Sequence, residues 1–312
     1  MNKWLLFLFL SFSHSFSFGQ EDSLDNARLA QMINLSEVVV RTDINVAKFI
    51  ERVKNDTTFY KAFRNLRVLG FTSLNDIRIT DKKGKQKAAL QSRTKQSRAD
   101  GCRTMDLLSE TTDGDFYDKN KNYNYYTAGL YAGLFFTTGK VCGETNVVKG
   151  VTFTAKGKSG LAKSKEQLKM LFFNPGKKIP GIPFIGNKIN IFDPGIAELY
   201  DFSIDQADYE GQSCYIFSVK VKEDLSGEQN DRIVIDNMIT WFSAKTMEVL
   251  ARNYDMSYNA GVYDFSVHME VQMTKFGQYL VPKILRYKGN WDVMFKKRER
   301  GTFTATLFDF SE

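Results

Sequence analysis

The sequence predicts an α+β fold, predominantly antiparallel β, dominated by one sheet that upstream helices cover. Two observations predict it. The last hundred residues, from Gly211 to Phe310, alternate regularly between apolar and polar side chains, as strands with one buried and one wet face do. Upstream, residues 44–66 carry apolar side chains at helical spacing. An aromatic content of 14% suits β-structure and large apolar contacts.

The clearest strand runs from Phe265 to Met273. Its odd-numbered side chains are apolar and its even-numbered ones are polar, so the two sets lie on opposite faces. The same alternation recurs in residues 215–221 and 303–307. We therefore expect at least six strands C-terminal to Tyr200. Pro282 has no N–H to donate to a ladder, so it should lie at an edge, a bulge or a strand end.

The chain begins with the pattern of a signal peptide at residues 1–19. Lys3 gives a positive start, residues 4–10 form an apolar core, and small residues at Ser17 and Gly19 suit cleavage before Gln20. We therefore expect an exported, periplasmic protein that is soluble or at most peripheral to the membrane. Residues 20–43 should form an N-terminal arm with a strand-like stretch at 35–40, followed by a single β-rich domain at 44–312.

Residues 44–66 should form two short helices, or one helix bent at Asn55-Asp56. Asp43 can cap the first helix, and both stretches place apolar residues at i, i+3, i+4 and i+7 (Val46, Phe49, Ile50, Val53; Phe59, Ala62, Phe63, Leu66). Residues 66–80 and 86–96 then predict a hairpin around Asp81–Gly84. Residues 103–108 predict a further strand, and residues 111–122 a polar loop.

Residues 123–195 form a helical and proline-rich insertion into this pattern. Residues 123–138 are strongly apolar and predict a helix, with a strand as the alternative, and residues 164–173 predict a second helix that ends at Asn174-Pro-Gly176. Four of the five prolines lie in this insertion, at 175, 180, 183 and 194. Because proline fixes φ, the loop at 177–186 should have a defined shape. It carries four apolar residues and is flanked by lysines.

Two interpretations of this loop are open. It could fold onto the sheet and close the core, or it could gate an apolar cavity or contact lipid. On the second interpretation, the hydrophobic ligand would be contacted by apolar residues of the insertion, namely Leu130, Leu134, Phe135, Phe172, Ile179, Ile182, Phe184 and Ile185. An anionic headgroup would be contacted by three lysines, Lys177, Lys178 and Lys188.

Catalytic and metal chemistry find no support in the residues. His268 is the one histidine beyond the signal peptide, on the polar face of its strand, so we expect neither a catalytic residue nor a metal or cofactor. Of the three cysteines, Cys214 should be a buried free thiol, whereas a bridge between Cys102 and Cys142 is left open. The formal net charge of +7 is compatible with anionic lipid and is no nucleic-acid signature.

Two stretches resemble the paired strands of LolA-type lipoprotein carriers. In Tyr209–Lys220 a tyrosine and a glycine precede a strand, and Trp241–Leu250 contains Lys-Thr-x-x-x-Leu. Residues 35–40 and Val281-Pro282 also resemble bacterial outer-membrane proteins that carry a carboxypeptidase-regulatory-like domain. The resemblance covers mainly residues 195–311. It implies an open, curved antiparallel sheet (a half-barrel) with helices packed on one face, the concave side, and it maps no ligand residue.

Two functions of different class follow from these observations. The first is a non-enzymatic periplasmic binding or carrier protein for a hydrophobic ligand, lipid or acyl, in the cell envelope. The second is a structural or assembly partner of an outer-membrane protein complex, which would contact another protein through its sheet or its aromatic loop.

Overall fold

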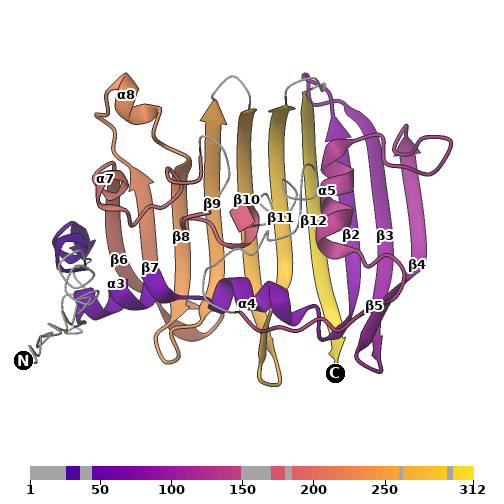
Figure 1. Cartoon of the computed structure of the whole chain (residues 1–312), viewed down its shortest axis with the longest axis horizontal. Coiled ribbons are helices and arrows are strands. Elements are labelled where there is room, and N and C mark those ends of the chain that lie inside the picture. The colour runs from indigo at the N-terminus through magenta and orange to yellow at the C-terminus, as the bar shows by residue number, and fades with distance from the viewer. Residues whose placement is uncertain (1–25, 36–43, 149–169, 180–184, 260–262, 294–297) are drawn as a thin grey trace, which may run out of the picture.

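A computed structural model describes residues 26–35, 44–148, 170–179, 185–259, 263–293 and 298–312. The predicted signal peptide and its cleavage site lie outside these residues, as do Asp43, Ile182 and Phe184. Twelve strands of the described chain form one sheet in the order β1-β6-β7-β8-β9-β10-β11-β12-β2-β3-β4-β5 (Figure 1). The sheet is open, because its two outer strands, β1 and β5, are not paired with each other.

The strands are long for most of the sheet. Their bounds are β1 Ile33–Leu35, β2 Gly70–Thr80, β3 Gln86–Ala99, β4 Cys102–Gly114, β5 Val141–Cys142, β6 Tyr200–Tyr209, β7 Gln212–Val221, β8 Ile235–Ser243, β9 Val249–Asn259, β10 Tyr263–Phe276, β11 Tyr279–Val293 and β12 Glu299–Ser311. Seven of them, β6 to β12, begin at or after Tyr200, which confirms the expected six or more.

Sequence neighbours pair with each other through most of the sheet, and all but one of the pairings are antiparallel. The exception is β1, which runs parallel to β6 and pairs Ile33 with Phe202. The C-terminal strand β12 pairs with β2, with Phe303 opposite Ile77, so the two ends of the domain meet in the middle of the sheet. This long-range pairing joins the N-terminal hairpins to the seven C-terminal strands.

Helices and irregular segments cover one face of the sheet. The helices are α3 Val46–Asn55, α4 Thr58–Asn65, α5 Tyr126–Phe135, α7 Pro194–Ala197 and α8 Gly227–Asn230, and residues 26–31 and 170–173 are also helical. In Figure 1, α3 and α4 run across the strands near one end of the sheet, and α5 lies over β12 and β2 on the same side. The predicted α+β fold with helices on one face is therefore confirmed.

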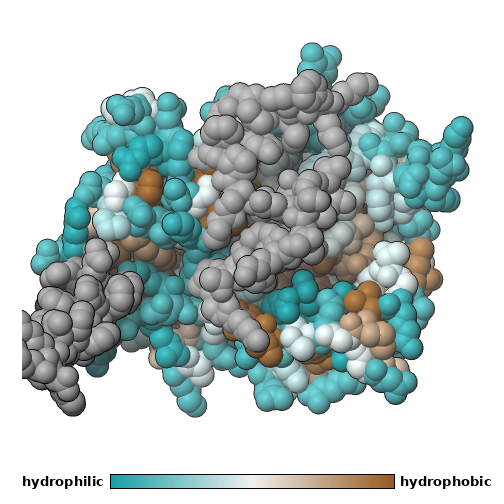
Figure 2. Space-filling view, viewed as in Figure 1, coloured by the Kyte–Doolittle hydropathy of each residue, from teal (hydrophilic) through white to brown (hydrophobic). Residues whose placement is uncertain are grey.

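The core lies between this face and its cover. On β10 the predicted odd-numbered side chains, Phe265 to Met273, are all buried. Apolar residues of α3 and α4 pack from the other side, among them Phe49, Ile50 and Phe59. In Figure 2, hydrophilic side chains line most of the rim of this face, and hydrophobic side chains show in patches inside the rim.

Several local predictions are confirmed and two are corrected. Residues 44–66 form two short helices, as one of the two alternatives had it, but Asn45 is the N-cap of the first and accepts a hydrogen bond from Lys48 N at 2.9 Å. Thr111–Gly114 belong to β4 and not to a loop, because they pair with β3. Pro282 lies at a bulge in β11, opposite Met273, as expected.

The three cysteines separate into a pair and a single thiol. Cys102 and Cys142 form a disulfide, which fastens the short edge strand β5 to β4. Cys214 is free and buried, as predicted. Among the described residues, no helix is both long and apolar enough to cross a membrane.

Candidate ligand-binding site

Aromatic side chains form a continuous layer between the sheet and its cover. The ring of Phe172 lies 5.7 Å from Tyr287 and 6.2 Å from Trp291, both on β11. The next ring, Phe173, stacks on Phe63 of α4 at 4.1 Å and meets Phe135 of α5 at 6.1 Å. Residues 170–173 thus lie between two helices and contact the sheet. We call this set of rings, with Tyr131, Phe265 and Phe303, the aromatic layer.

The predicted apolar site residues fall in this layer or beside it. Leu130, Phe135, Phe172, Ile179 and Ile185 are buried, and Leu134 is half-buried. Phe135 also meets Phe303 of β12 at 6.0 Å, so α5 and residues 170–173 face neighbouring strands. Ile182 and Phe184 lie outside the described residues. Their contact with a ligand stays a prediction.

The three predicted headgroup lysines have very different surroundings. Lys178 is exposed. Lys188 is half-buried, and its Nζ donates to Asp231 O at 2.7 Å and to Tyr258 Oη at 3.1 Å. Lys177 is buried, and its Nζ donates to the backbone oxygens of Lys54, at 2.8 Å, and of Asp56. Its ammonium therefore holds the junction between α3 and α4, a role that the sequence did not suggest.

Burial changes the pKa of Lys177. Removal from water disfavours the charged ammonium and lowers the pKa of Lys177 to about 8, although the nearby Asp56 carboxylate acts in the opposite direction. Arg252 adds to the lowering through charge repulsion. Lys177 is thus still mostly protonated at neutral pH, inside the protein.

Arg252 is a second buried cation, which the sequence reasoning missed. It lies on β9 and is 4% exposed, with its guanidinium 4.4 Å from the centre of the Phe59 ring. Its Nε donates to Thr240 Oγ1 at 2.9 Å. A signal was available, because Arg252 shares the alternation phase of Tyr254, Met256 and Tyr258, all of them buried. When the alternation places a charged side chain on the buried face of a strand, the sequence alone indicates a buried charge that needs a partner.

Asp56 is the carboxylate that faces both cations. It is 9% exposed and accepts hydrogen bonds from Thr58, at 3.0 Å from the backbone N and 2.7 Å from Oγ1. These bonds fix it at the start of α4. Lys177 and Arg252 each interact electrostatically with it. We call Asp56, Lys177 and Arg252 the buried charge cluster.

A polar network occupies the covered face nearer β4. Tyr131 Oη of α5 donates to Asn75 Oδ1 at 2.6 Å, and Ser73 Oγ donates to the same oxygen at 2.7 Å. Asn75 Nδ2 in turn donates to Ser92 Oγ at 3.2 Å. The buried donors and acceptors of this network are paired with one another, and their hydrogen bonds attach α5 to the sheet.

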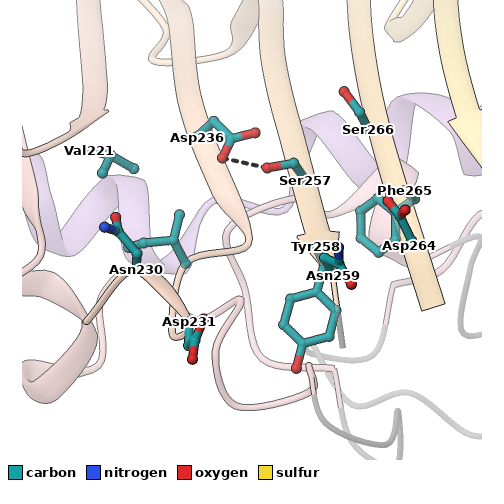
Figure 3. A pocket seen from close by; sticks show the side chains of 11 residues that line it. Val221, Asn230, Asp231, Asp236, Ser257, Tyr258, Asn259, Asp264, Phe265 and Ser266 are labelled. Carbon is teal, nitrogen blue, oxygen red and sulfur yellow. Dashed lines mark hydrogen bonds between the residues drawn. The ribbon is translucent and has the colours of Figure 1, made fainter. Parts of the chain in front are cut away.

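A separate cavity of about 440 Å³ lies at the ends of β8, β9 and β10 (Figure 3). Its lining is mixed: it combines apolar residues such as Ile233 and Phe265 with three carboxylates, those of Asp231, Asp236 and Asp264. Ser257 Oγ donates to Asp236 Oδ1 at 2.8 Å, and burial nevertheless raises the pKa of Asp236. None of the sequence-predicted site residues lines this cavity, and its three carboxylates are a poor match for an acyl chain or an anionic headgroup.

His268 lies on the outer, polar side of β10, as expected. Its Nδ1 is 2.7 Å from Asp255 Oδ1 and its Nε2 is 3.2 Å from Glu270 Oε1. Although burial lowers the pKa of His268, the hydrogen bonds to these carboxylates outweigh that effect and raise it. Within the described part of the chain, no group of three or more histidine, cysteine, aspartate or glutamate residues could hold a metal ion.

The chain thus has an open antiparallel sheet with one covered, aromatic face, the architecture implied by its LolA-like strand motifs. No protein-family model and no curated protein matches the chain.

Similar solved structures include three proteins. A DUF1329 family protein from Desulfovibrio piger is 10% identical over 93% of this chain and 91% of its own, with a TM-score of 0.24. A putative outer membrane lipoprotein-sorting protein domain from Vibrio parahaemolyticus is 8% identical over 84% and 89%, with a TM-score of 0.25. Lipovitellin is 7% identical over 78% of this chain and 25% of its own, with a TM-score of 0.27.

Proposed function

We propose that the protein binds a hydrophobic ligand, lipid or acyl, between the covered face of the sheet and the elements that cover it, and carries that ligand in the cell envelope. The observation that carries this proposal is the aromatic layer. Its rings come from the sheet, from α4 and α5, and from residues 170–173, and the described part of the cover consists of short helices and irregular segments. Short pieces can separate from the sheet at a lower cost than a paired sheet can.

The proposed site differs from an ordinary closed core in its composition. Large aromatic side chains supply much apolar area with few rotatable bonds, which suits contact with an acyl chain. Export belongs to the same proposal and rests on the signal-peptide pattern of residues 1–19. The envelope is where a carrier of this kind has lipid within reach.

Photo-crosslinking with a fatty acid that bears a diazirine on its chain tests this proposal. We expect saturable labelling, competed by unlabelled fatty acid, on peptides that contain Phe135, Phe172 or Trp291. Fragmentation of the labelled peptides assigns the label to single residues. Phe308 and Leu74, on the opposite face of the sheet, provide the internal control and should stay unlabelled. Labelling that does not saturate, or that falls mainly on the opposite face, would contradict the proposal.

An assembly role is the second candidate, and the free edge of the sheet favours it. β5 pairs with β4 at Cys102 and Arg103, and in the described chain no strand flanks the rest of that edge. Leu107 and Leu108 on this stretch are 57% and 50% exposed. An exposed strand edge can accept a strand from another chain.

A photoreactive amino acid at Leu107 tests the assembly role in cells. Cross-linking to one defined outer-membrane protein from position 107, and none from the equally exposed Leu74, would support it. Equal cross-linking from both positions would show that the edge has no dedicated partner.

A further inference from the structure

The buried charge cluster has an excess of positive charge. Arg252 and Lys177 face one carboxylate, that of Asp56, and the other ionisable side chain that interacts with Arg252 is the neutral Tyr254. The Tyr254 hydroxyl is already used, because it donates to Phe172 O at 2.6 Å. Among the described residues, the two cations and one anion of the buried charge cluster thus sum to a net charge of about +1.

The guanidinium of Arg252 also has more hydrogen-bond donors than the described residues supply acceptors for. Among the described residues its guanidinium makes one hydrogen bond, from Nε to Thr240 Oγ1, although the group has five N–H donors. Burying a charged group costs several kcal/mol unless it is paired and hydrogen-bonded. Arg252 is 4% exposed and its guanidinium stacks on Phe59, so only a small part of the residue is in contact with water.

The cluster also adjoins the proposed ligand site. Arg252 and Tyr254 lie on the same face of β9, two residues apart, and both are buried. Tyr254 is hydrogen-bonded to the backbone of Phe172, whose ring contacts Trp291. Trp291 in turn stacks on Phe265 at 4.9 Å. A ligand with a polar end at Arg252 would therefore have aromatic rings along its chain.

We propose that Arg252, supported by Lys177, binds the single anionic group of an amphiphilic ligand whose acyl chain occupies the aromatic layer. This inference rests on the proposed carrier function and adds the class of ligand, a monoanionic amphiphile. The planar guanidinium presents paired donors that fit a carboxylate or a phosphate. Both a fatty acid and a phospholipid with one phosphodiester supply such a group.

Equilibrium binding to the wild-type protein decides between an anionic and a neutral ligand. Oleic acid, oleyl alcohol and oleoyl lysophosphatidylglycerol are compared at pH 7.5, each by displacement of a neutral fluorescent apolar probe. We expect the two anionic ligands to bind roughly tenfold or more tightly than the alcohol, as charge-assisted hydrogen bonds allow. The ratio between the acid and the lysophospholipid identifies the preferred headgroup.

Three variants test whether Arg252 is responsible for the preference for anionic ligands. Arg252→Met should reduce the preference for anionic ligands to about onefold, while Arg252→Lys should keep part of it. Lys61→Met removes an exposed lysine of α4 that is not among the predicted headgroup lysines, and it should leave the ratio unchanged. Circular dichroism and thermal unfolding establish that each variant is folded. If Arg252→Met does not fold, the wild-type ratio and Arg252→Lys still decide.

Equal affinity of the wild-type protein for acid and alcohol would overturn this inference and leave the carrier function standing. Absence of binding by all three ligands would instead contradict the carrier function itself. A preference for anions that survives in Arg252→Met, or that disappears in Lys61→Met, would place the anion site elsewhere.

Discussion

Lys177 shows how little a local sequence can say about a single charged residue. It is one of nine lysines between positions 149 and 188, a stretch that contains one acidic residue, Glu166. Nothing in its neighbours distinguishes it from Lys178, yet one of the two is buried and the other is exposed. The difference arises from α3, whose last carbonyl groups need donors and receive them from Lys177.

The pH dependence of stability should report the burial of Lys177. Its pKa falls from 10.5 in the unfolded chain to about 8 in the folded protein. Between pH 8 and pH 10.5 the unfolded chain therefore holds a proton that the folded protein has lost, so the free energy of unfolding should rise with pH across this window. The rise should reach about 3 kcal/mol, and the full cost of the buried charge should apply below pH 8.

Urea unfolding of wild-type protein and Lys177→Met at several pH values between 7.5 and 10.5 measures this contribution. The difference between the two curves should grow with pH in favour of wild type. Lys178→Met is the matched control and should follow the wild-type curve. Parallel curves for wild type and Lys177→Met would show that Lys177 is solvated.

Arg252 is a residue that sequence reasoning could have found. The alternation of β9 places it among buried side chains, and a charge in that phase is an exception that calls for a partner. The partners themselves could not have been predicted. Asp56 and Phe59 lie almost two hundred residues away in the chain and approach Arg252 only through the packing of α4 on the sheet.

At the scale of elements, strands with one solvent-exposed and one buried face were predictable from the sequence. Strands whose two faces are both exposed were not. β10 alternates cleanly, so its sequence shows both its presence and its buried face. The end of β4 has polar or exposed residues on both faces, which removes the alternation and made Thr111–Gly114 resemble a loop. α5 is apolar on most sides, and for that reason helix and strand stayed alternatives.

The start of α5 depends on a side chain from the far end of the chain. The carboxylate of Glu299, at the start of β12, accepts hydrogen bonds from Tyr126 N at 2.7 Å and from Thr127 N at 2.9 Å. Thr127 Oγ1 also donates to it at 3.1 Å. No side chain of α5 itself caps this end. Glu299 therefore replaces a local N-cap and joins the helix to the sheet.

Glu299→Ala should lower the free energy of unfolding by about 1–2 kcal/mol, the usual cost of losing a cap, and Glu299→Gln should cost less. Urea denaturation followed by circular dichroism measures both. Glu223→Ala is the control, because its partner is Lys220 in an ion pair that leaves 83% of the Glu223 side chain exposed, and it should change stability little. Equal losses in Glu299→Ala and Glu223→Ala would contradict the capping role.

At the scale of the molecule, the order of the strands was beyond sequence reasoning. The motifs indicated an open sheet with one-sided helices, and the structure has both. The pairing of β12 with β2 has no local signature, and it brings α5 over the strands that carry Phe303 and Tyr287. The aromatic layer depends on this arrangement. Its members from the insertion at 123–195 were predictable from the sequence, but the strand residues that complete the layer were not.

The central claim is that the covered face of the sheet holds a hydrophobic ligand. Native mass spectrometry of the protein, purified without detergent from the envelope of cells that export it, tests this claim most directly. The account predicts a bound species with the mass of an anionic lipid or fatty acid, released at moderate collision energy and much reduced in Arg252→Met. Protein that carries no lipid, and that also fails to take up oleic acid when it is supplied, would contradict it.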